Sequence, residues 1–80
     1  MKLTIISPSQ SKIFDVDWIE VQTEKGTFIV QKGHAPTIVT IPENNELTLS
    51  LADGSTTVMN ITGGILEVKR DSILLLLTHD

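Results

Sequence analysis

The sequence is poor in residues that many enzymes and nucleic-acid-binding domains use. Its 80 residues include no cysteine, no tyrosine, one tryptophan and two histidines. Without cysteine the chain can form neither a disulfide framework nor a thiolate nucleophile. With so few aromatic side chains it offers no platform on which bases could stack. These absences fit a reducing compartment and argue against thiol chemistry and nucleic-acid binding.

Basic residues and long apolar runs are also scarce. Six Lys and Arg face ten Asp and Glu, a net charge of -4. Such a surface is not attracted to the phosphates of nucleic acids or to anionic lipids. The longest apolar run is Ile73 to Leu77, whereas a membrane helix needs ~20 apolar residues. The run Leu3 to Ile6 is too short for a signal peptide. We therefore expect a protein made and kept in the cytosol, with no nucleic acid partner and no direct membrane insertion.

The length predicts one domain, residues 1–80. A domain of this size buries only ~60% of the surface that its unfolded chain exposes, so a partner surface would help to stabilise it. Hydrophobic residues make up 40% of the chain and charged residues 20%, a composition typical of a globular protein.

Apolar residues recur with a period of two. Leu47, Leu49 and Leu51 alternate with less apolar residues, and Ile19 and Val21 share one face of a second run. This pattern is typical of half-buried strands in an antiparallel sheet. Turn signals separate the runs, and no window carries the 3.6-residue period of an amphipathic helix. The sequence predicts an all-β fold, a flattened antiparallel β-sandwich of about 8–10 short strands.

Three segments carry more specific expectations. Asp53-Gly54 lies between two alternating runs and predicts a type I′ hairpin turn. Gly63-Gly64 predicts a bulge or a tight turn with positive φ. The run Ile73 to Leu77 is apolar on both faces, so both faces should be covered. Either a loop or sheet edge shields its outer face, or that face meets another subunit.

The sequence contains no convincing catalytic site. His34 and His79 are far apart, and a cupin-like metal site would have to combine them with Glu67 without any H-x-H spacing. No serine lies in a G-x-S-x-G motif. Gly63-Gly64 lacks the Lys-Ser/Thr of a phosphate-binding loop. We predict no catalytic, cofactor-binding or metal-binding residues, and hence a module that acts by presenting a surface.

Three stretches together resemble a known family. They are Leu3–Pro8 with Ile13–Val21, Gly26–Val30 leading into Gly33-His34-Ala35-Pro36, and Gly63–Val68 before the last strand. In this order they resemble the N-terminal β-sandwich domain of the epsilon subunit of the F-type ATP synthase. The resemblance covers essentially the whole chain.

The resemblance implies a non-catalytic rotor subunit of the central stalk, which couples the gamma subunit to the c-ring of a proton- or sodium-translocating ATP synthase. It implies a peripheral position on the cytoplasmic side of the inner (plasma) membrane, no cofactor, and a monomer when isolated. Many family members continue into a C-terminal helical hairpin that inhibits ATP hydrolysis or binds ATP. This sequence stops at Asp80, so we expect neither hairpin inhibition nor ATP sensing.

The resemblance also suggests partner-binding residues. Ser7 and His34 match positions on the gamma side, although Ser7 could equally just end a strand before Pro8. The loop Lys25-Gly26-Thr27 matches one that approaches the c-ring, with Thr27 where familiar members carry an acidic residue.

Apolar residues suggest further contacts, because burying a leucine contributes ~1.5–3 kcal/mol and an exposed ion pair only ~0–1 kcal/mol. Ile38, Val39 and the outward leucines of the run 73–77 are therefore candidates for the gamma side. Trp18 should point outward with Glu20, either as an interface anchor or lying flat over the sheet edge. The alternative function is an independent β-sandwich binding module or a small cupin-like metal enzyme.

Overall fold

The alternating segments form strands. The computed structural model describes all 80 residues and contains eight strands and no helix, which confirms the predicted all-β sandwich. The strands are β1 (Lys2–Ile6), β2 (Ser11–Thr23), β3 (Gly26–Gln31), β4 (Thr37–Ile41), β5 (Asn45–Leu51), β6 (Thr56–Ile61), β7 (Gly64–Val68) and β8 (Ser72–Leu77). No helix is therefore available to span a lipid bilayer.

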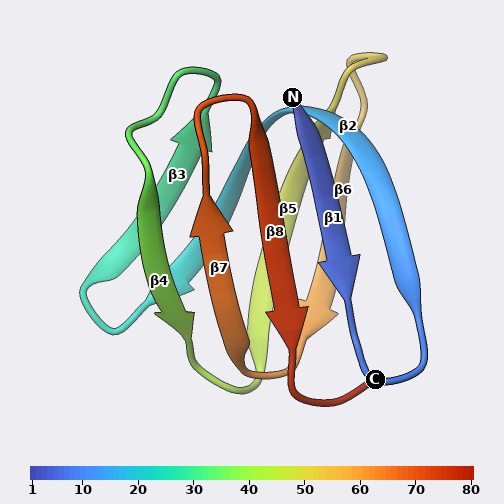
Figure 1. The fold of residues 1–80 in the computed structure, drawn as a ribbon, viewed down its shortest axis with the longest axis vertical. Helices are drawn as coiled ribbons and strands as arrows, with labels where there is room; N and C mark the ends of the chain where they lie inside the picture. The colour runs from blue at the N-terminus through green and yellow to red at the C-terminus, as the bar shows by residue number, and fades with distance from the viewer.

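Strand β2 belongs to both layers of the sandwich. Its first half pairs with β1, and its second half pairs with β3 and β5. The pairing with β5 shifts register between Val16 and Trp18, which marks a bulge that bends the strand. Sheet A contains β4, β7, β8, β1 and the first half of β2. Sheet B contains β3, the second half of β2, β5 and β6, and lies behind sheet A in Figure 1.

One strand pair departs from the antiparallel expectation. β1 and β8 run parallel through the middle of sheet A, with Leu3 beside Ile73 and Ile5 beside Leu75. All other pairs are antiparallel. The parallel pair places the first and last strands side by side, so it links the two ends of the chain (Figure 1).

The core lies between the two sheets. Alternate residues of the strands point inward and form one cluster of 14 buried apolar side chains. They are Leu3, Ile5, Val16, Ile19, Val21, Val30, Ile41, Leu47, Leu49, Ile61, Leu66, Val68, Ile73 and Leu75. Because a strand exposes every second side chain, this inward set fixes which residues occupy the outer faces.

The hairpin at Asp53-Gly54 exists, but the predicted type I′ turn is wrong. Gly54 has a φ of 93°, whereas Asp53 does not have positive φ. The amide of Gly54 donates to the carbonyl of Leu51 at 2.9 Å, and the amide of Leu51 donates to the carbonyl of Ser55 at 2.8 Å. This is a three-residue loop with a bulge at glycine. The Asp53 carboxylate stabilises it by accepting bonds from the amide and hydroxyl of Ser55.

The expectation of positive φ at Gly63-Gly64 is also wrong. Neither glycine has positive φ. Gly64 instead passes so close to β8 that a Cβ atom would collide with the carbonyl oxygen of Leu76. The carbonyl of Gly63 accepts bonds from the amide and the hydroxyl of Thr78, at 2.9 and 2.8 Å. The glycine pair is therefore explained by close approach of two backbones.

Candidate partner-binding surface

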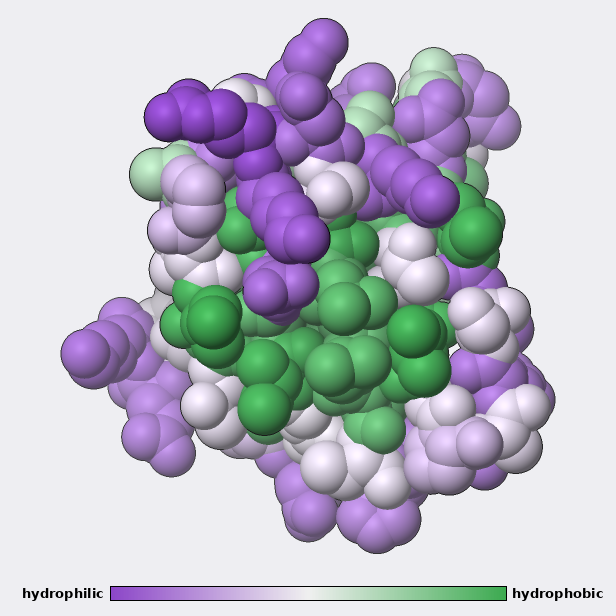
Figure 2. All heavy atoms as spheres, in the orientation of Figure 1, coloured by the Kyte–Doolittle hydropathy of each residue, from purple (hydrophilic) through white to green (hydrophobic).

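The outer face of sheet A carries a central cluster of apolar side chains. The strand registers place outward side chains in rows that cross the sheet, and the row Asp15–Lys2–Ser72 is polar. The apolar side chains belong to two other rows, Ile6–Leu76–Ile65–Thr40 and Ile13–Thr4–Leu74–Glu67–Ile38. Figure 2, which views this face, shows hydrophobic residues gathered over its centre with hydrophilic residues around them.

Five of the seven large apolar side chains that the fold leaves exposed lie on this face. Their exposed fractions are 37% for Ile6, 63% for Ile13, 71% for Ile38, 47% for Ile65 and 42% for Leu76. We call these five residues the apolar face. A contiguous exposed patch of this kind marks an interaction surface in a small domain.

The last strand settles one alternative left open by the sequence. In β8, Ile73 and Leu75 are buried, whereas Leu74 is half-buried and Leu76 is 42% exposed. The outer side of Leu76 is therefore open to solvent, and that of Leu74 is partly open. The run is apolar on both faces, but the chain itself covers only one of them.

The outer face of sheet B has a different character. Trp18 points outward with Glu20 and pairs across the sheet with Gln31 and Ser50. The next row combines the exposed side chains of Ile29 and Val58 with the polar side chains of Glu20 and Thr48. Trp18 is half-buried and takes no part in the core. It therefore lies on the opposite side of the sandwich from the apolar face.

Ser7 and His34 are not brought together. Ser7 follows the end of β1, and His34 lies in the loop from β3 to β4. That loop contacts the other end of the sandwich, where the Gly33 amide donates to the Arg70 carbonyl at 3.0 Å. Ser7 instead lies beside the C-terminal residue, since its hydroxyl donates to the Asp80 carboxylate at 2.6 Å. A partner that contacts both must span the full length of the sandwich.

The loop around His34 is held by local contacts. The His34 amide donates to the carbonyl of Gln31 at 3.1 Å, and its Nδ1 lies 2.7 Å from the carbonyl oxygen of Ala35. Its ring meets Phe28 edge-on, with centroids 5.4 Å apart. These contacts orient the imidazole within the loop, as expected for a structural histidine.

Ile38 and Val39 point to opposite sides of β4. Ile38 belongs to the apolar face, whereas Val39 points inward, is half-buried and packs against the core. Adjacent residues of a strand face opposite ways, so only Ile38 is available to a partner on the outer face of sheet A.

The turn containing Lys25, Gly26 and Thr27 is well ordered by side-chain bonds. The Thr23 hydroxyl accepts a bond from the Lys25 amide at 3.1 Å and donates to the Gly26 carbonyl at 2.8 Å. Gly26 has a φ of 111°, which favours glycine. The Thr27 hydroxyl donates to the Gln22 side chain at 3.1 Å.

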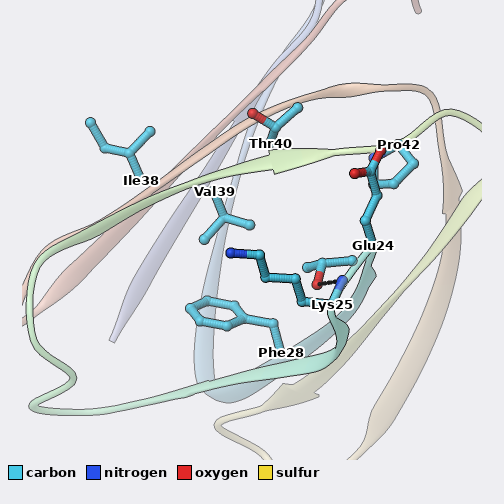
Figure 3. Close-up of a pocket in the computed structure, with 8 residues that line it drawn as sticks. Glu24, Lys25, Phe28, Ile38, Val39, Thr40 and Pro42 are labelled. Atoms are coloured by element: carbon cyan, nitrogen blue, oxygen red, sulfur yellow. Dashed lines mark hydrogen bonds between the residues drawn. The ribbon is translucent and has the colours of Figure 1, made fainter.

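Beside this turn lies a groove of about 610 Å³ between β3 and β4. It is lined by residues of both strands and of the turns that flank them. They are Thr23, Glu24, Lys25, Phe28, Ile38, Val39, Thr40 and Pro42. In Figure 3 the Lys25 side chain extends over the groove towards Phe28 and Val39.

Two of the carboxyl groups have pKa values shifted by hydrogen bonds. No three His, Asp or Glu side chains gather in a way that could hold a metal ion. The pKa of Asp80 is lowered by hydrogen bonds from the Ser7 hydroxyl and from Ser9, and that of Asp53 is lowered by hydrogen bonds from Ser55. Both carboxyls are fully exposed and serve turns.

Sequence reasoning missed one buried polar residue. Asn45 is only 7% exposed, and its side-chain amide donates to the carbonyl of Gln22 while its side-chain oxygen accepts from the Glu46 amide at 2.8 Å. It therefore ties the start of β5 to the end of β2. Its position directly after Asn44, which has a φ of 55°, is the kind of Asn-Asn turn that often uses such bonds.

These features describe a β-sandwich domain with an apolar cluster on the outer face of sheet A and a mixed, more polar outer face on sheet B. The family model for the β-sandwich domain of the ATP synthase delta/epsilon chain matches residues 1–78. The chain therefore belongs to this family of ATP synthase delta/epsilon β-sandwich domains.

Solved structures share the fold. A chain in the central stalk and c-ring of the Tetrahymena thermophila mitochondrial ATP synthase superposes with a TM-score of 0.81 at 16% identity, over 98% of this chain and 63% of that one. A chain in the Euglena gracilis mitochondrial ATP synthase, in a structure of its OSCP, F1 and c-ring, gives 0.84 at 20% identity, over 96% and 49%. This chain thus spans less than two thirds of either neighbour. No curated protein of known function matches its sequence.

Proposed function

We propose that this chain is a non-catalytic subunit of the central stalk of an F-type ATP synthase, where it couples the gamma subunit to the c-ring. The observation that carries the proposal is an uncovered apolar face on a domain whose family is that of ATP synthase delta/epsilon chains. The similar chains in the two solved assemblies support it, since one of those structures is of a central stalk with its c-ring.

The apolar face is the proposed contact with gamma. A part that transmits torque needs a contact that does not slip. Burial of aliphatic side chains, at ~1.5–3 kcal/mol each, suits this task better than exposed ion pairs.

The c-ring contact is proposed at the end of the sandwich that carries the turn Lys25-Gly26-Thr27, with the backbone of the turn and Thr27 facing the c-ring while the Lys25 side chain extends over the groove. Thr27 offers a hydroxyl where familiar members carry a carboxylate. Glu24, Glu43 and Glu46 line a shared depression beside this turn. The negative charge that the sequence lacks at Thr27 is therefore present nearby on other residues, which supports the assignment of this end.

Trp18 is proposed as an anchor for a second contact, because it lies on sheet B and faces away from the apolar face. It is the only tryptophan, so intrinsic fluorescence reports on it alone. We expect its emission to change when a gamma–c-ring preparation binds. Unchanged emission with a preparation that demonstrably binds would remove Trp18 from the interface and leave it as a cover over the sheet.

The remaining expectations stay predictions. They are a monomer when isolated and a peripheral position on the cytoplasmic side of the inner (plasma) membrane.

The test of the proposed function is capture of gamma. Immobilised chain should retain gamma from detergent-solubilised membranes that contain an ATP synthase, and should not retain it when excess free chain competes. Failure to bind purified gamma or a gamma–c-ring preparation at micromolar concentrations would contradict the proposal. The cupin-like alternative makes the opposite prediction for a chelator, since EDTA should then lower the unfolding temperature of the isolated chain.

A further inference from the structure

Two strands of the sandwich end its sheets on the same side. β3 pairs only with β2, and β4 pairs only with β7, although β3 and β4 follow one another in the chain. Each therefore has one edge whose backbone amides and carbonyls have no strand partner. Figure 1 shows both edges at the same flank of the molecule, β4 in front and β3 behind.

The edge of β4 lacks the devices that keep sheet edges unpaired. Proteins blunt free edges with lysine, proline or bulges inside the strand. β4 reads Thr-Ile-Val-Thr-Ile from Thr37 to Ile41, with no charge, no proline and a regular register along β7. Pro36 and Pro42 only bound it. All five residues are β-branched, which favours an extended backbone.

The groove lies along this edge. Three consecutive residues of β4, from Ile38 to Thr40, line it, and Phe28 of β3 lies across from them. Phe28 and Val39 are half-buried side chains that pack against the core, so the groove exposes the flank of the core at this point. Through Ile38 the groove is continuous with the apolar face.

Lys25 adds a charge to the groove. Its side chain extends over the groove towards Phe28 and Val39 (Figure 3). The only ion pair in the chain joins the N-terminal amine to Asp15, so the Lys25 ammonium has no carboxylate partner within the molecule. A carboxylate on an incoming segment would complement it.

The structure points to a strand acceptor site: we propose that an extended segment of gamma adds to the free edge of β4. Its backbone would pair with the outward amides and carbonyls of β4, an apolar side chain would cover Phe28 and Val39, and an acidic side chain would meet Lys25. This inference rests on the proposed function, because it takes the segment from gamma. Strand pairing at β4 would add backbone hydrogen bonds to the contact that the adjoining apolar face is proposed to make with gamma.

A third free edge, that of β6, tests whether the proposed site is a general property of sheet edges in this fold. β6 pairs only with β5 and is also uncharged. However, it belongs to sheet B, whose outer face mixes Ile29 and Val58 with polar side chains, and the depression at its end is smaller, about 380 Å³, with Ile61 and Leu77 as its hydrophobic lining. β6 is therefore the matched internal control.

Residue-resolved hydrogen exchange of the full chain, free and bound to purified gamma, tests the inference. About half of the β4 amides should point away from β7, because antiparallel partners bond at alternate residues. These amides should exchange fast in the free chain and become at least roughly tenfold slower in the complex. The outward amides of β6 should stay fast in both states.

A charge-reversal pair provides a second readout. Lys25→Glu should weaken binding of gamma by roughly 3–10-fold, whereas Lys12→Glu, the same change on the opposite edge of sheet A, should stay within roughly 2-fold. Both residues are exposed, so neither variant should unfold the domain.

The outcomes separate the two proposals. Binding of gamma without protection of β4 overturns the strand acceptor and leaves the stalk function standing. If the β4 amides become protected without gamma as the concentration of the chain rises, the edge pairs with a second copy of the chain. That result also overturns the strand acceptor for gamma. If gamma does not bind at all, the proposed function fails, and the inference fails with it.

Discussion

The hydroxyl of Ser7 donates a hydrogen bond to the carboxylate of Asp80 across 73 positions of sequence, at 2.6 Å. The same carboxylate oxygen accepts the Ser9 amide at 3.0 Å. The turn after β1 is thereby tied to the C-terminal residue, next to the parallel pair of β1 and β8. Ser7 thus has a structural role of its own, whatever partner it meets.

The Ser7–Asp80 contact should make a small contribution to stability that depends on pH. Its hydrogen bonds hold the pKa of Asp80 below the ordinary value of a free aspartate, so the contribution is present above that ordinary value and is lost as the pH falls through the folded pKa. The unfolding temperature should be measured from pH 6 to pH 2. For Asp80→Asn it should fall less steeply with decreasing pH than for the unchanged protein. Asp17→Asn, which removes an exposed carboxyl elsewhere, serves as the control, and equal slopes for both variants would contradict the prediction.

Gly64 should tolerate no side chain. A Cβ atom there meets the backbone of Leu76 and Leu77, which cannot move without breaking the β7–β8 ladder. Gly64→Ala should lower the free energy of unfolding by about 1–3 kcal/mol or more. Urea denaturation is the measurement.

Gly63→Ala is the matched control for this prediction. A Cβ atom there would lie 3.1 Å from the Cγ of Glu43, on an exposed side chain, and 3.2 Å from the backbone carbonyl oxygen of Ile41, both much farther away than the Leu76 oxygen is from a Cβ atom at Gly64. We expect a smaller loss than for Gly64→Ala. The reverse order would show that close approach to β8 is not the reason for the glycine.

Asn45 should be a stability determinant although no sequence motif identifies it. Asn45→Ala leaves the carbonyl of Gln22 and the amide of Glu46 without their partner, which should cost about 1–3 kcal/mol. Asn45→Asp keeps the acceptor for Glu46 but removes the donor to Gln22, so it should also destabilise the domain. Chemical denaturation of both variants measures this, and an unchanged midpoint for Asn45→Ala would contradict it.

The apolar face should matter for binding and not for folding. Ile38→Lys and Ile65→Lys change side chains that are 71% and 47% exposed, so each should alter stability by no more than about 0.5 kcal/mol. Each should weaken binding of gamma by roughly tenfold or more, because it removes an aliphatic side chain and buries a charge. Titration calorimetry measures the affinity.

Val58→Lys provides the control on the other layer. Val58 is 58% exposed on the outer face of sheet B, so the same change there should leave the affinity for gamma unaltered. If Val58→Lys weakens binding as much as Ile38→Lys does, gamma does not dock on sheet A.

The alternation of apolar and polar residues along the chain was enough to predict several structural features. The alternation of Leu47, Leu49 and Leu51 located β5, because a strand exposes every second side chain whatever lies opposite it. The outward orientation of Trp18 beside Glu20 followed in the same way. The turn type at Asp53-Gly54 did not, because the carboxylate of Asp53 favours a longer loop by bonding Ser55.

The local sequence pattern could not predict which of the proposed contact residues share a surface. Ser7 and His34 lie at opposite ends of the sandwich, and Val39 points inward while Ile38 points outward. Whether two distant residues share a surface depends on which strands become neighbours. That choice is made by the combined burial of all strands, and no single segment encodes it.

Composition and periodicity by themselves determined that this chain is acidic, all-β and without thiol chemistry, since those properties depend on residue types and local spacing. The tertiary structure alone decided that Ile6, Ile13, Ile38, Ile65 and Leu76 form one face, and that β4 keeps a free edge beside a groove. The physical reason is that β2 bends at its bulge and β1 lies parallel to β8. Contacts between residues far apart in sequence thus choose which side chains meet solvent together.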